Sequence, residues 1–210
     1  MRKWIWIIAC LATTAVRAQS PGFKPAANLE QFKQQFAKTA QQTKSIKSDF
    51  VQEKNLSMLS EKITSKGKFW FKKEDKVKME YQTPSYYLVI INGKDIKTKD
   101  SQKENRISAK SSKVFQQVSR ITADCVQGNV LNNADFSTKV FENAQFYQLE
   151  MTPVAKGIKD YFKKIVLWVD KKDYAVTKLQ MQEQSGDDTV MSFVNKETNV
   201  NIPDEVFAVK

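Results

Sequence analysis

Residues 67–96 alternate between apolar and polar side chains over successive short segments that are separated by turns. Alternation with a period of two places every second side chain on the same face of a β-strand. Pro84 interrupts the pattern because proline cannot donate a hydrogen bond to a neighbouring strand. Asn92 and Gly93 interrupt it again with the residue pair that favours a two-residue hairpin. The stretch therefore predicts an antiparallel meander of four strands.

One face of this meander is predicted to carry large apolar side chains, whereas the other face carries mainly lysine. A sheet of this kind must bury its apolar face against a core or around a ligand. We expect eight side chains to share the apolar face and to line a cavity: Phe50, Phe69, Phe71, Val77, Met79, Tyr81, Leu88 and Ile90. Periodicity alone does not distinguish a packed core from a lined cavity, so both interpretations stay open.

The rest of the chain predicts further strands and two amphipathic helices. Residues 45–55 and 61–71 alternate as strands do, and Gly67 within the second indicates a bulge or a sharp bend. Apolar side chains recur at helical spacing after Asn28, a good N-cap, and again in residues 113–127. The predicted lid residues are Leu29, Phe32 and Phe36 in the first helix and Phe115, Val118 and Ile121 in the second.

These elements predict a mainly β (α+β) fold, an open or incomplete antiparallel β-barrel of about ten to eleven strands. The two helices are expected to cover its apolar concave face as a lid. A barrel of this size is too wide to be filled by its own side chains, which favours a ligand cavity. No linker or repeat interrupts residues 19–210, which are expected to form a single domain.

Residues 1–18 have the pattern of a secretory signal peptide. A short basic start precedes an apolar run, and Ala18 ends a small-residue pattern that favours cleavage before Gln19. The apolar run is too short to span a bilayer. Residues 7–10, which read IIAC, resemble a lipobox, so acylation at Cys10 is the alternative. Cleavage after Ala18 and location in the periplasm are the favoured interpretation.

Composition narrows the possible functions. Cleavage would remove three basic and no acidic residues, which lowers the net charge from +11 to +8. A positive charge can favour binding to nucleic acid, binding to an anionic membrane surface, or solubility alone. Export from the cytoplasm disfavours nucleic acid as a partner. The chain has no histidine, and Cys125 is the only cysteine after residue 18. This excludes an internal disulfide, histidine-dependent catalysis and most zinc sites.

The remaining candidates for catalysis have simpler explanations. Ser65 and Lys68 have the spacing of a Ser-x-x-Lys pair, but in a strand they lie on opposite faces. The adjacent carboxylates Asp187 and Asp188 belong to a glycine-led turn, where solvent surrounds them. We therefore expect no enzymatic activity, no metal site and no cofactor.

Three segments in succession resemble those of the LolA family, the periplasmic carriers that move lipoproteins to the outer membrane. They read GKFWFKK at 67–73, VKMEYQTP at 77–84 and LVIINGK at 88–94, with weaker likenesses at 48–52, 147–153 and 202–207. The resemblance implies an open barrel with a helical lid that binds acyl chains. It also implies a monomeric carrier whose partners are acylated lipoproteins, an inner-membrane lipoprotein-releasing transporter and an outer-membrane acceptor.

The chain departs from the family pattern where the lid is controlled. An arginine that follows the tryptophan strand in the family holds the lid closed, and Lys73 takes its place here. Lysine lacks the planar fork of arginine, so we expect Lys73 to be a looser latch. Two alternatives to a carrier remain, an acceptor anchored in the outer membrane and a lipid-binding sensor of the cell envelope.

Overall fold

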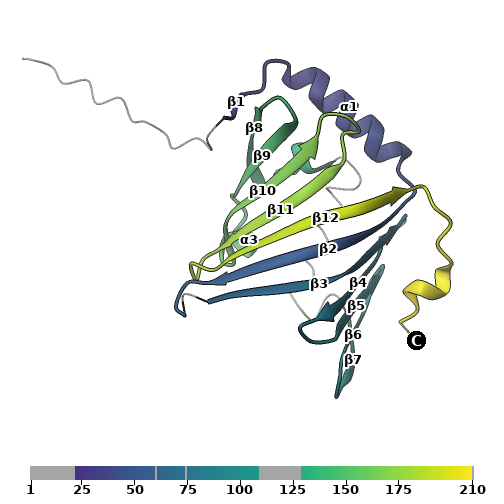
Figure 1. Ribbon diagram of the computed structural model, residues 1–210. Helices are drawn as coiled ribbons and strands as arrows, with labels where there is room; N and C mark the ends of the chain where they lie inside the picture. The colour runs from purple at the N-terminus through teal and green to yellow at the C-terminus, as the bar shows by residue number, and fades with distance from the viewer. Residues whose placement is uncertain (1–21, 60, 74, 109–128, 210) are drawn as a thin grey trace, which may run out of the picture.

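The computed structural model describes residues 22–59, 61–73, 75–108 and 129–209. Within these residues, twelve strands form one antiparallel sheet in the order β1-β8-β9-β10-β11-β12-β2-β3-β4-β5-β6-β7. β1 and β7 lie at opposite edges, so the sheet is strongly curved but open (Figure 1). The mainly β fold and the incomplete barrel predicted from the sequence are confirmed.

The strands occur where alternation predicts them, with small shifts at their ends. Their bounds are β1 Lys24–Pro25, β2 Ser45–Leu56, β3 Glu61–Lys72, β4 Lys76–Thr83, β5 Tyr87–Asn92, β6 Asp95–Asp100, β7 Glu104–Ser108, β8 Phe136–Glu142, β9 Phe146–Pro153, β10 Phe162–Asp170, β11 Val176–Glu183 and β12 Asp188–Thr198. The two-residue β1 pairs with β8 at the edge of the sheet. The sheet therefore has twelve strands, compared with the predicted ten to eleven.

Helices are few in the described part of the chain. They are α1 Leu29–Gln42 and the short α3 Lys156–Lys159, with 3-10 turns η2 Asn129–Asn132 and η3 Asp204–Phe207. Asn28 caps α1 as predicted, because its side chain accepts a hydrogen bond of 3.0 Å from the backbone N–H of Gln31. None of the helices described is long and apolar enough to cross a membrane. The helix expected at 113–127 lies outside the described residues.

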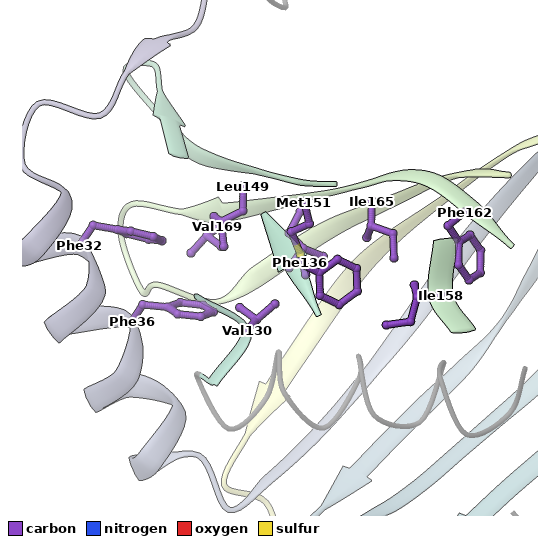
Figure 2. Packing of buried hydrophobic residues seen from close by; sticks show 11 residues of the cluster. Phe32, Phe36, Val130, Phe136, Leu149, Met151, Ile158, Phe162, Ile165 and Val169 are labelled. Carbon is purple, nitrogen blue, oxygen red and sulfur yellow. The ribbon is translucent and has the colours of Figure 1, made fainter. Parts of the chain in front are cut away.

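Two clusters of buried apolar side chains lie on the face of the sheet that packs against α1, which we call the inner face. The first cluster joins α1 and η2 to β8, β9, β10 and α3 (Figure 2). The second lies on β2, β3, β4, β5, β6 and β12. Leu179 of β11 packs against both clusters, so the apolar surface is continuous along the inner face.

The C-terminal residues 199–209, which we call the strap, cover part of the opposite, outer face beside β3, β4 and β5 (Figure 1). Ile202 and Phe207 of the strap are buried there in a third apolar cluster. Lys72 holds the strap with a hydrogen bond of 2.8 Å to the carbonyl of Ile202 and an ion pair of 2.6 Å with Asp204. The hydrogen bonds from Lys72 and Lys76 lower the pKa of Asp204.

Gly67 allows β3 and β4 to approach each other closely at the middle of the inner face. A Cβ atom there would lie 2.2 Å from the carbonyl oxygen of Glu80 and 2.7 Å from the ring of Phe50. The register between β3 and β4 shifts at the same point, so the predicted bulge is confirmed. The ring of Phe50 thus occupies the space that any other side chain at position 67 would need.

The contacts of Gly67 predict that Gly67→Ala destabilises the protein. The backbone oxygen of Glu80 cannot move aside without breaking strand pairing, so we expect a loss of at least about 2 kcal/mol in the free energy of unfolding. Gly93→Asn is the matched control, since Gly93 has a φ of +58° and open space around it. Asparagine tolerates that conformation, so the control should lose less than about 1 kcal/mol. Urea unfolding measures both, and equal losses would contradict the steric account.

Candidate functional site

Six of the eight predicted cavity residues lie together on the inner face. Phe50, Phe69, Phe71 and Val77 are buried in the second cluster, and Met79 and Tyr81 pack against it. The strand register explains this, because Phe69 is paired with Met79, and Phe71 with Val77. Directly paired residues share a face, as the alternation predicted. Whether these side chains bind acyl chains stays a prediction.

Leu88 and Ile90 do not lie on the inner face, and for them the predicted shared face is wrong. They are buried on the outer face with Ile202 and Phe207 of the strap. Their neighbours Val89 and Ile91 take the inner positions in the second cluster. Residues 88–91 are apolar without interruption, so period two cannot tell which pair faces inward. Burial of β5 on both faces is the physical reason for the error.

Helix α1 covers the first cluster, as a lid would. Phe32 is fully buried, and its ring lies 4.2 Å from that of Tyr147 and 5.6 Å from that of Phe36, between ring centroids. Phe36 points from the helix toward Val130 and the sheet (Figure 2). Leu29 is 39% exposed and lies outside the cluster, because it is the first residue of the helix, one turn before Phe32.

The lid residues Phe32 and Phe36 cover a part of the inner face that lies outside the predicted cavity. The side chains under α1 come from β9 and β10, whereas the predicted cavity residues belong to β2, β3, β4 and β5. The residues missed are Leu149, Met151, Ile165, Leu167 and Val169. They alternate as clearly as Phe69 and Phe71 do, so the same period indicates their shared face, although it does not indicate which strands α1 covers. The predicted lid residues Phe115, Val118 and Ile121 lie outside the described residues.

Lys73 contacts the C-terminal end of α1. Its Nζ donates a hydrogen bond of 2.6 Å to the carbonyl oxygen of Gln41, and its backbone N–H donates one of 2.9 Å to the carbonyl of Lys44. The last turn of α1 contains no basic residue, although its free carbonyl groups favour a cation. Lys73 supplies that cation from the end of β3. Its side chain forms this single hydrogen bond with the described residues, and whether Lys73 is a looser latch than arginine stays a prediction.

Tyr81 carries a polar group on the inner face. Its hydroxyl donates a hydrogen bond of 2.9 Å to Oε1 of Gln52 on β2. Burial, with a smaller contribution from Tyr87, raises the pKa of Tyr81 to about 12. The hydroxyl therefore stays neutral at physiological pH and adds no charge to the apolar surface.

The described residues offer little for catalysis or metal binding. They contain no group of three Cys, Asp or Glu side chains placed to hold a metal ion. A depression of about 520 Å³ lies at the edge of the sheet, and an ion pair of 2.7 Å between Lys171 and Glu142 spans part of its wall. Nζ of Lys171 lies 4.6 Å from the ring centroid of Tyr147, which packs against the first cluster. The two clusters of the inner face offer mainly apolar contact among the described residues.

Comparison with known proteins assigns the family. The family model described as outer membrane lipoprotein carrier protein LolA matches residues 41–210. The chain belongs to the LolA family. Members of the LolA family are extracytoplasmic carrier or binding proteins rather than enzymes. No curated protein matches the sequence.

Two solved structures with TM-scores of 0.50 or more support the fold at low sequence identity. An uncharacterized conserved protein from Thermus thermophilus matches with a TM-score of 0.52 and 8% identity, over 83% of this chain and 91% of that one. MucB matches with a TM-score of 0.50 and 13% identity, over 88% of this chain and 64% of MucB. A LolA superfamily protein from Nitrosomonas europaea has a TM-score of 0.45 and 12% identity, with 87% of this chain and 98% of that one covered.

These contacts predict that apolar packing, rather than Lys73, holds α1 on the sheet. Phe32→Ala removes a fully buried ring and should cost about 3 kcal/mol or more in the free energy of unfolding. Lys73→Leu removes one exposed hydrogen bond and should cost less than about 1 kcal/mol. Chemical denaturation of the two variants gives the comparison. A larger loss for Lys73→Leu would show that the latch dominates.

Proposed function

We propose that this protein is a periplasmic chaperone that binds the acyl chains of lipoproteins on its inner face and carries them from the inner to the outer membrane. The observation that carries the proposal is the continuous apolar inner face, part of which lies under helix α1. Among the described residues, the side chain of Lys73 forms one hydrogen bond with that helix. Family membership supports a binding role. The proposed partners are acylated lipoproteins, a lipoprotein-releasing transporter and an outer-membrane acceptor.

The energetics of acyl chains explain why such a carrier needs this face. Burial contributes about 0.8 kcal/mol per CH₂ group, so one C16 chain in water costs roughly 12 kcal/mol. A lipoprotein with several chains therefore needs an apolar surface to cross an aqueous compartment. The inner face offers aromatic rings from β2 and β3 and further apolar side chains from β9 and β10.

A carrier must also release its cargo, which favours an adaptable surface over a rigid one. Methionine is flexible and fills irregular gaps, and the inner face contains Met79, Met151, Met181 and Met191. Helix α1 is joined to the sheet by apolar contacts that acyl chains can replace with contacts of the same kind. Entry of a chain under α1 therefore exchanges one apolar contact for another.

The two alternatives from the sequence remain distinguishable. An outer-membrane acceptor would be acylated at Cys10, whereas a carrier would begin at Gln19, and mass spectrometry of the mature N-terminus separates them. A lipid-binding sensor would bind acyl chains without transferring lipoproteins between membranes. A transfer assay from inner-membrane vesicles to outer-membrane vesicles separates that function from a carrier.

We expect Phe36→Glu to abolish binding of a fluorescent fatty acid. The substitution places a charge at a side chain that is 1% exposed in the first cluster, next to the predicted acyl chains. Gln34→Glu is the control, since it adds the same charge to an exposed position of the same helix. Circular dichroism confirms that both variants are folded. Unaltered binding in Phe36→Glu would exclude α1 from the binding site.

Lys73→Leu should reduce lipoprotein transfer only modestly, by about threefold or less, because the lost hydrogen bond is exposed and single. The assay compares transfer between membranes by the wild type and by the variant at equal protein concentration. Complete loss of transfer with normal stability would show that Lys73 performs the full role of the arginine it replaces.

A further inference from the structure

Ser48 presents an unpartnered hydroxyl inside the second apolar cluster. It is 3% exposed, and its Oγ has no hydrogen-bond partner among the described residues. Ser48 lies on the inner face between Ile46 and Phe50 of β2, and it is paired with Phe69 of β3. A buried hydroxyl without a partner costs about 1–3 kcal/mol, which an alanine at the same place would avoid. The hydroxyl is therefore available to a partner beyond the described residues.

Two aromatic rings meet above β2 beside this hydroxyl. Phe69 on β3 and Phe193 on β12 belong to strands on opposite sides of β2, yet their ring centroids are 5.3 Å apart. Phe69 is paired with Ser48, and Phe193 with Phe50, so both rings stand on the inner face beside the small serine side chain. Phe69 is buried and Phe193 is partly buried.

Strand β12, which pairs with β2 on the side opposite β3, is irregular near Ser48. The pairing of β12 with β2 shifts between Val194 and Glu197, opposite Asp49 and Lys47. Asn195 in this bulge has a φ of +54° and donates a hydrogen bond of 2.9 Å to Asp49. The bulge supplies no hydrogen bond to Ser48, so neither neighbouring strand satisfies the hydroxyl.

Thr138 on β8 carries the other buried hydroxyl without a partner in the described part of the chain, but it is less buried than Ser48. Ser48 is three residues from the start of β2, near the point where α1 joins the sheet. A polar group bound at Ser48 would leave an attached hydrocarbon free to run deeper, along Phe50 and toward Tyr81.

We infer that the Ser48 hydroxyl donates a hydrogen bond to the carbonyl oxygen of an ester-linked acyl chain, with Phe69 and Phe193 as an aromatic gate above it. The inference rests on the proposed function and specifies its ligand. A hydrocarbon chain offers no acceptor, whereas the ester that joins it to glycerol does. The site should therefore discriminate between ester-linked and ether-linked chains of equal length.

The test is a titration with two lipopeptides that differ only in this linkage. One carries two palmitoyl esters on its glyceryl-cysteine, and the other carries two hexadecyl ethers. One hydrogen bond predicts that the wild type binds the ester probe about three- to tenfold more tightly than the ether probe. Ser48→Ala should lower affinity for the ester to that for the ether and leave the ether unchanged.

Ser45→Ala is the matched control. Ser45 lies on the same strand and is 4% exposed, but its hydroxyl already donates a hydrogen bond of 2.6 Å to the carbonyl of Val200. The control should keep the ester preference and lower the melting temperature. Ser48→Ala should not lower the melting temperature of the unliganded protein, because it removes no hydrogen bond.

The outcomes separate the inference from the proposed function. Equal affinities of the wild type for ester and ether in both the lipopeptide and the phospholipid pair, or an ester preference that persists in Ser48→Ala, would overturn the inference and leave acyl binding intact. A fall in stability of Ser48→Ala equal to that of Ser45→Ala would also overturn it. If the wild type bound neither probe, the proposed function itself would fail.

Phospholipids carry the same ester as lipoproteins, so dipalmitoyl phosphatidylethanolamine and its diether analogue are titrated in parallel. An ester preference with the lipopeptides assigns the ligand to lipoproteins. A preference with the phospholipids alone keeps Ser48 as the donor and assigns the ligand to membrane lipid.

Discussion

Burial of one continuous apolar face is the constraint on which the rest of this structure depends. An antiparallel sheet with alternating side chains has one apolar face, and an open sheet cannot enclose that face by pairing its own edges. The strong curvature brings the apolar side chains of β8, β9 and β10 and those of β2, β3 and β4 onto a single inner surface. Gly67 contributes to this arrangement, because the ring of Phe50 occupies the space left by its missing side chain.

The cover of this face is attached in a way that suits exchange. Phe32 and Phe36 provide most of the contact between α1 and the sheet, while Lys73 adds one hydrogen bond at the end of the helix. The outer face is covered differently, by a strap that is held with ion pairs and hydrogen bonds as well as by Ile202 and Phe207. Helix α1 is held mainly by apolar contacts, which an acyl chain can replace. The strap is also held by polar contacts, which an acyl chain cannot replace.

The sequence predicts the strands and α1 well, because each has a regular period and a recognisable end such as Asn28 or Gly93. It predicts the wrong face for Leu88 and Ile90, because β5 is apolar on both sides and the strap that buries its outer side comes from a distant part of the chain. It also leaves Leu149 and its neighbours out of the site, since period two does not indicate which strands a helix will cover. The environment of Ser48 depends on three strands and a bulge in β12, which no local pattern contains.

The most direct test of the account is to locate a bound acyl chain on the protein. A palmitoylated lipopeptide with a diazirine near the end of one chain can be photocrosslinked to the full-length protein, and the modified residues identified by mass spectrometry. The account predicts modification of inner-face side chains such as Phe50, Phe69 and Leu149. Modification concentrated on the outer-face cluster of Leu88, Ile90, Ile202 and Phe207 would contradict it.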